Sequence, residues 1–175
     1  MLMRSDSLAV SVTSENLEHP FQAVVKVLLI SPFDEDHEAL GEILRHSKWE
    51  QHSSRTQAEA LKFIRTNPTP VVICESELPD GTWKGLLDEF ACMPYAPALA
   101  VSSRLADDVL WSEALNLGAY SVLTTPFDMK EVFHVVSCAW LNWKRQWEPR
   151  QRETVRSHSP WPETERNLLK LKAAS

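Results

Sequence analysis

The stretch VVICESELPDG, residues 71–81, decides how this chain folds. It begins with an uninterrupted apolar run, residues 71–74, which is typical of a short strand covered on both faces of its sheet. It ends with Pro79-Asp80-Gly81, a combination that marks a turn. Glu75, which directly follows the run, is therefore predicted at the carboxyl end of a buried strand.

The same strand character recurs along the chain, with helical patterns between the runs. The further strands are predicted at residues 24–30, 49–53, 98–101 and 121–123. Amphipathic helices are predicted at residues 34–44, 56–67, 83–92, 106–117 and 128–147. Because short buried strands alternate with helices, this order predicts an α/β domain with a parallel sheet between two helical layers. In such sheets function lies beyond the carboxyl ends of the strands.

Length and charge indicate one domain with two extensions. The chain has 175 residues and a net charge of −6, which suits a single domain. We assign residues 1–23 to a flexible leader, 24–147 to the domain, and 148–175 to a basic, proline-containing tail that is disordered or partly helical. Most of the negative charge lies in the domain, and an acidic body does not suit a nucleic-acid-binding protein.

Composition excludes several other classes. No run of about 18 apolar residues suggests a membrane span, and no apolar signal-peptide core follows Arg4. Three cysteines do not suggest a disulfide framework, so we expect a cytoplasmic protein. With only four glycines, the chain has no glycine-rich loop for a nucleotide or flavin phosphate, and Ser31-Pro32-Phe33 follows the first strand instead.

The order of elements and the strand ends resemble the receiver domain of bacterial response regulators over residues 25–147. The segments that carry the resemblance are residues 74–81, Leu117-Gly118-Ala119 and Thr124-Thr125-Pro126-Phe127. The resemblance implies a flavodoxin-like (βα)5 fold, a doubly wound parallel sheet of five strands in the order 2-1-3-4-5. It also implies a role in two-component phosphorelay signalling and a cis bond before Pro126.

The residues that an active receiver needs are mostly replaced here. By resemblance, Ser31 and Pro32 stand where two acids would bind Mg²⁺, Glu75 stands at the phosphoacceptor aspartate, and Thr125 stands at the lysine. Ser102 alone matches, at the switch Ser/Thr position. Phosphoryl transfer needs groups that neutralise the transferred charge, and Mg²⁺ prefers anionic oxygens. We therefore expect a non-enzymatic pseudo-receiver with no metal, no cofactor and no ordinary phosphorylation.

Two interpretations of Glu75 stay open. Its carboxylate either mimics the phosphorylated state and draws Ser102 inward by a hydrogen bond, or is a solvated acid in a degenerate pocket. An alternative function is unconventional phosphorylation, on Glu75 or on a neighbouring acid such as Glu77 or Asp80.

Two further acids, Asp34 and Asp36, have a similar ambiguity. They form either a displaced metal pair or, as we prefer, a helix N-cap and a first-turn acid. Asp80 is expected to form hydrogen bonds within its own turn.

A partner surface is expected where the helix at 106–117, the strand at 121–123 and the last helix meet. Trp111, Val122 and Trp147 are assigned to this face by resemblance. A large exposed aromatic residue is typical of interface hot spots, although Trp111 could instead fold over a neighbouring side chain. The expected partner is a signalling protein, such as a histidine kinase or an output protein, or a second copy of the chain.

Overall fold

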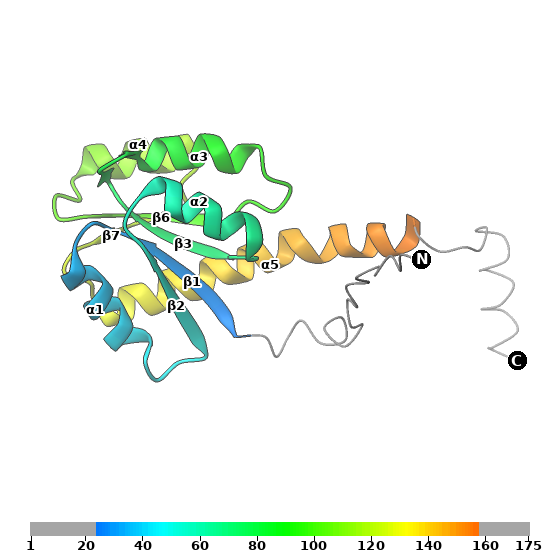
Figure 1. Cartoon of the computed structure of the whole chain (residues 1–175), viewed down its shortest axis with the longest axis horizontal. Coiled ribbons are helices and arrows are strands. Elements are labelled where there is room, and N and C mark those ends of the chain that lie inside the picture. The colour runs from blue at the N-terminus through cyan, green and yellow to red at the C-terminus, as the bar shows by residue number, and fades with distance from the viewer. Residues whose placement is uncertain (1–23, 158–175) are drawn as a thin grey trace, which may run out of the picture.

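The structure is a computed structural model that describes residues 24–157 and, for side chains, residues 24–146 (Figure 1). Its centre is a parallel sheet of five strands in the order β2-β1-β3-β6-β7. The strands are β1 (Val25–Ile30), β2 (Trp49–Ser54), β3 (Val71–Glu75), β6 (Ala98–Ser103) and β7 (Ser121–Thr124). The predicted order of five parallel strands, 2-1-3-4-5, is confirmed.

Two helical layers cover the sheet. The helices are α1 (Asp34–Leu44), α2 (Gln57–Thr66), α3 (Trp83–Ala91), α4 (Asp108–Leu117) and α5 (Met129–Ser157). Alternation along β1 divides the core: Leu28 and Ile30 pack with residues of α2, α3 and α4, while Val27 and Leu29 pack with residues of α1 and α5. Figure 1 shows these two layers on opposite sides of the sheet.

A short hairpin follows β3 and supports the next layer. Strands β4 (Glu77–Leu78) and β5 (Gly81–Thr82) pair in antiparallel fashion. In the turn between them, the Asp80 carboxylate accepts hydrogen bonds from the N–H groups of Gln57 (2.7 Å) and Ala58 (2.9 Å). Asp80 therefore caps the start of α2, and it also accepts the predicted local hydrogen bond, from its own backbone.

The electrostatics of this cap favour the ionised acid. Partial desolvation raises the pKa of the Asp80 carboxyl, but the backbone hydrogen bonds from α2 outweigh it, and the net pKa lies below its ordinary value. The positive end of the helix dipole at α2 acts in the same direction. Asp80 is thus a structural acid.

Several predicted boundaries can now be compared with the structure. Thr56 caps α2 through its side chain, and Gly118 ends α4 with a positive φ of 102°. The Thr125-Pro126 bond is cis, as predicted. Asp34 was predicted as the N-cap of α1, but it is the first helical residue, and Phe33 occupies the cap without a side-chain hydrogen bond.

The last helix was predicted to end at Trp147, which was wrong. Helix α5 has 29 residues and continues through Pro149 to Ser157. A proline inside a helix removes one backbone hydrogen bond and does not have to terminate it. Figure 1 shows the C-terminal part of α5 projecting beyond the sheet. The predicted leader and the remainder of the tail, residues 158–175, lie outside the described residues.

Within residues 24–157, no helix combines the length and the apolar character that crossing a membrane requires.

Candidate functional site

The sequence-predicted site residues meet at the carboxyl edge of the sheet. Ser31, Glu75, Ser102 and Thr125 follow or end β1, β3, β6 and β7, and all four are buried. Glu75 and Ser102 are direct register partners on neighbouring strands. The convergence follows from the topology, because parallel strands end at one edge.

Only one of the two carboxylate oxygens of Glu75 accepts hydrogen bonds among the described residues. Its Oε1 accepts hydrogen bonds from the N–H of Ser76 (3.0 Å) and from the Ser76 hydroxyl (2.9 Å). Its Oε2 is buried and has no hydrogen-bond partner within the described part of the chain. Burial raises the pKa of the Glu75 carboxyl above its ordinary value, although the Ser76 hydrogen bonds and the nearby Arg104 oppose this.

Both interpretations of Glu75 therefore require correction. It is buried and not a solvated acid, because it ends a strand that is covered on both faces. It also forms no hydrogen bond with Ser102, whose hydroxyl lacks a partner among residues 24–146. The Glu75 carboxylate instead accepts a hydrogen bond from the hydroxyl of Ser76, the next residue in the chain. The Thr125 hydroxyl, at the expected lysine position, is likewise buried and unpartnered in this region.

Asp34 and Asp36 lie in different environments. The Asp34 side chain is 73% exposed and pairs with Arg55. The Asp36 side chain is only 5% exposed, and its Oδ2 accepts a 2.6 Å hydrogen bond from the Ser31 hydroxyl. Asp36 is therefore more than a first-turn acid, since it points into the site, whereas Asp34 does not. The two do not form a metal pair.

One site residue escaped the sequence analysis. Arg104, in the loop that joins β6 to α4, extends its guanidinium over the carboxyl edge of the sheet. Its Nη2 lies 2.7 Å from Glu35 Oε1 and 3.2 Å from Asp36 Oδ1, and its Nη1 lies 3.8 Å from Glu75 Oε2. The guanidinium carbon also lies 4.0 Å from the centre of the Phe33 ring, a cation–π geometry.

A sequence signal for Arg104 did exist. Arg104 stands two residues after Ser102, at the same edge as Glu75, which ends β3, and as Glu35 and Asp36, which come after β1. A cation placed there is expected to meet those acids. A pattern of strands and helices does not predict how far the Arg104 side chain reaches across the loops.

The residues at this edge do not fit the Mg²⁺ ion that the receiver resemblance implies. Asp36 already accepts hydrogen bonds from Ser31 and Arg104, and Glu75 Oε1 accepts two from Ser76. Glu75 Oε2 accepts no hydrogen bond among the described residues, but it lies 3.8 Å from Arg104 Nη1. The positions of the acid pair hold a hydroxyl and a proline ring, not the anionic oxygens that Mg²⁺ prefers. Across the described residues, no three His, Cys, Asp or Glu side chains are grouped so that they could hold a metal ion.

The predicted partner face is only partly a surface. Val122 is fully buried, because on β7 it faces the core layer shared with Ala114 of α4, so its assignment to this face was wrong. Trp111 is half-buried and packs against the same core cluster, which matches the alternative that it folds over its neighbours. The side chain of Trp147 lies outside the described ones. Four large apolar side chains on or just before α4 are instead exposed, and the most exposed are Leu105 (83%) and Val109 (73%), followed by Leu117 and Leu115.

Comparisons with known proteins identify the fold. No sequence model of a protein family matches the chain, and no curated protein matches it. Among solved structures, the signal receiver domain of an HD domain-containing protein from Pseudomonas fluorescens is 22% identical, with a TM-score of 0.62 over 73% of this chain and 93% of that one.

Two further structures agree with this fold. The beryllofluoride-activated NtrC4 receiver domain dimer is 21% identical, with a TM-score of 0.63 over 67% of this chain and 98% of that one. The receiver domain of a signal transduction histidine kinase from Syntrophus aciditrophicus is 19% identical, with a TM-score of 0.60 over 69% of this chain and 93% of that one. The chain therefore has the flavodoxin-like fold of receiver domains.

Proposed function

We propose that this chain is a cytoplasmic, non-enzymatic receiver-type module of a two-component pathway, which acts through protein–protein contact without being phosphorylated. The observation that carries the proposal is the position of Arg104. Its guanidinium bridges Glu35 and Asp36 and lies beside Glu75, so the acids of the site already have a counter-charge from the chain itself.

This arrangement opposes ordinary receiver chemistry at two points. Phosphoryl transfer to a carboxylate needs cations that neutralise the transferred group, and receivers use a metal and a lysine for this. Here Ser31 and Pro32 stand at the positions of the acid pair, and Thr125 stands at the position of the lysine. The Arg104 guanidinium already forms ion pairs with carboxylates of the chain itself. The partner-binding surface of the module would then have the same conformation whether or not a phosphoryl donor is present.

A second candidate, phosphorylation on Glu75 itself, is favoured by one feature. Glu75 Oε2 accepts no hydrogen bond within the described residues, and Arg104 Nη1 lies 3.8 Å away. An arginine can stabilise a phosphoryl group, as arginine fingers do. This candidate requires Arg104 to release its partners on α1.

The two candidates differ in a direct chemical test. The full chain is incubated with acetyl phosphate and Mg²⁺, and separately with beryllofluoride and Mg²⁺, and followed by intact mass and by amide NMR. We expect no phosphoryl adduct and no shifts at Glu75, Ser102 or Arg104. An adduct that Glu75→Gln abolishes would establish the second candidate and overturn the first.

The contact function has its own test. A partner recovered from the native cell by the unmodified chain should be retained equally with and without acetyl phosphate. The variant Val109→Asp should lose it, because Val109 is a largely exposed apolar side chain on α4. Val24→Asp is the matched control, since Val24 is also an exposed valine but precedes β1. Recovery that requires acetyl phosphate would contradict the proposal.

A further inference from the structure

Three buried side-chain oxygens at the carboxyl edge of the sheet have no hydrogen-bond partner within residues 24–146. They are Glu75 Oε2, Ser102 Oγ and Thr125 Oγ1, and their residues are only 5%, 0% and 7% exposed. A buried polar group without a partner is costly, and most such groups in folded proteins are paired. Three of them at one edge therefore indicate a place where a hydrogen-bond donor binds.

The three side chains lie on the same side of the sheet. Side chains alternate along a strand, so each of them shares the side of the residue two positions before it. Those earlier residues are Ile73, Ala100 and Leu123, which all belong to the core cluster shared with α1 and α5. Glu75 and Ser102 are register partners, and the N–H of Thr125 donates a 3.1 Å hydrogen bond to the Ser103 carbonyl. Because neighbouring strands lie about 4.8 Å apart, the three oxygens form one cluster.

The chemistry of this cluster suits a primary ammonium group. Carboxylate and hydroxyl oxygens accept hydrogen bonds, and an ammonium group has three N–H donors and no acceptor. The surroundings are negative, because the carboxylates of Glu35, Asp36 and Glu75 face the guanidinium of Arg104. Burial raises the pKa of the Glu75 carboxyl, and a cation at Oε2 acts against that rise.

Arg104 is the charge that opposes a second cation, and its contacts limit this opposition. Its Nη2 is engaged by Glu35 and Asp36, whereas its Nη1 lies 3.8 Å from Glu75 Oε2, which is longer than a hydrogen bond. The three oxygens are buried, so an ammonium group enters by taking the place of Nη1 beside Oε2. Arg104 then gives up only this long contact and keeps both acids of α1.

The surface beside Arg104 is apolar. The Phe33 side chain is 41% exposed and stacks on the guanidinium, and Leu105, the residue after Arg104, is largely exposed. The aliphatic stem of a lysine packs on apolar surface of this kind while its ammonium group remains free to bind an acid.

We propose that a lysine side chain of a protein partner binds at this cluster. Its ammonium group donates hydrogen bonds to Glu75 Oε2, Ser102 Oγ and Thr125 Oγ1. Its stem lies against Phe33 and Leu105. The inference rests on the proposed contact function, and it gives the chemistry of the partner, a basic segment that presents one lysine to the carboxyl edge of the sheet.

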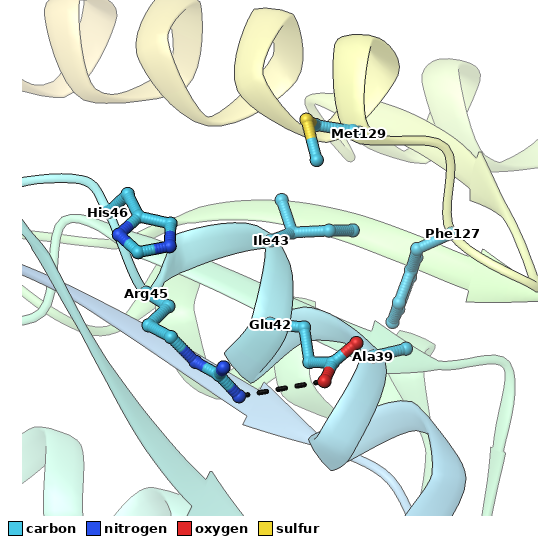
Figure 2. Close-up of a pocket in the computed structure, with 7 residues that line it drawn as sticks. All are labelled: Ala39, Glu42, Ile43, Arg45, His46, Phe127 and Met129. Atoms are coloured by element: carbon cyan, nitrogen blue, oxygen red, sulfur yellow. Dashed lines mark ion pairs between the residues drawn. The ribbon is translucent and has the colours of Figure 1, made fainter.

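The pocket between α1 and the start of α5 does not offer this chemistry (Figure 2). It has a volume of about 400 Å³, and the carboxylate in its lining, that of Glu42, already pairs with Arg45 at 3.5 Å. Figure 2 shows Ile43 and Met129 pointing toward one another across it. A lysine placed there would meet Arg45 and an apolar lining, so the pocket does not compete for an ammonium group.

The experiment is an amide NMR titration of the full chain at neutral pH and constant ionic strength. The probe is Nα-acetyl-lysine N-methylamide, and its control is the same compound acetylated at Nε, which keeps the stem and loses the charge. We expect saturable shifts at Glu75, Ser102 and Thr125 with the probe only. Methylammonium should bind several-fold more weakly, because it has no stem to contact Phe33 or Leu105.

Two matched variants link the binding to Glu75. In Glu75→Gln we expect the affinity for the probe to fall about tenfold or more, because a hydrogen bond to a charged acceptor is lost. Glu77→Gln removes an exposed acid two residues further along the chain and should leave the affinity unchanged. The amides of α3, which packs on the opposite side of the sheet, report that each variant keeps its fold.

Four results would overturn the inference. The probe gives no saturable shift, as expected if the cluster holds an ordered water molecule only; the Nε-acetylated control binds equally well; methylammonium binds as tightly as the probe, so that the ligand is a free amine; or Glu75→Gln binds the probe like the wild type. No phosphoryl donor is present in this titration. A failure here therefore leaves the proposed contact function standing, whereas a phosphoryl adduct on Glu75 overturns that function.

Discussion

Replacing Arg104 by methionine should destabilise the domain far more than replacing a comparable surface arginine. Arg104→Met removes the guanidinium but keeps an unbranched side chain that can still pack on Phe33. The matched control is Arg55→Met. Arg55 stands in the loop after β2 and pairs with Asp34 on the surface. Both variants remove one positive charge. They differ in the acid that loses its partner, which is the exposed Asp34 in Arg55→Met and includes the buried Asp36 in Arg104→Met.

The magnitude follows from the burial of the partners. The Glu35 carboxylate is 74% exposed, so its pair with Arg104 contributes about 0.5 kcal/mol. The Asp36 carboxylate is 5% exposed, and removing its charged donor leaves a buried acid with Ser31 as its hydrogen-bond donor, which costs about 1.5–2 kcal/mol. The total is about 2–2.5 kcal/mol, against about 0.5 kcal/mol for Arg55→Met.

Urea unfolding at neutral pH, with the slope m fitted for each variant, measures both losses. Asp36→Asn should be combined with Arg104→Met in a double-mutant cycle, which we expect to show a coupling of about 1 kcal/mol. If Arg104→Met loses no more stability than Arg55→Met, or if the cycle shows no coupling, the guanidinium is a surface group and the reasoning on the site is refuted.

Two pH-dependent predictions follow from the other acids. Because the folded-state pKa of Glu75 is raised, its ionised form costs stability, and the wild type loses stability as pH rises from about 4.3 through that pKa. Glu75→Gln should therefore raise Tm at pH 7.5 and give no gain at pH 4; a gain that is larger in acid would contradict this. The Asp80 pKa is lowered, so its contribution is present above the ordinary value and is lost as pH falls below it. Asp80→Asn should cost about 1 kcal/mol at pH 7, and thermal melts should show the difference shrinking towards pH 3, whereas Asp88→Asn serves as a control with no effect on α2.

The fold was largely predictable because its signals are local. The apolar runs at β1 and β3 are continuous, and the capping residues Thr56 and Gly118 act on their own helices. The same logic placed Glu75 and Ser102 together, since parallel strands end at one edge. Asp80 shows the limit of the method, because a local pattern predicts the hydrogen bond to its own backbone but not those from Gln57 and Ala58 of α2.

The site was less predictable because its decisive contacts run between loops. Asp36 was interpreted as a helix-start acid, which its position in α1 supports, but its carboxylate is buried against Ser31. Val122 lies on a four-residue strand, too short for alternation to reveal which face is inward. Arg104 directly follows β6, which indicates that it lies at the acidic edge of the sheet, but the sequence does not show how far its side chain reaches towards α1 and β3.

The separation of the Arg104 contacts along the chain has a kinetic consequence. Arg104 and Glu35 are 69 residues apart, and they meet only when β1, β3 and β6 have been aligned in one sheet. Because this ion pair joins two side chains beyond the strand ends, we expect it to form after the folding transition state and to have a φ-value near zero. Its stabilisation then acts on the rate of unfolding and hardly on the rate of folding. The arginine that neutralises the site is therefore also expected to slow the unfolding of the domain.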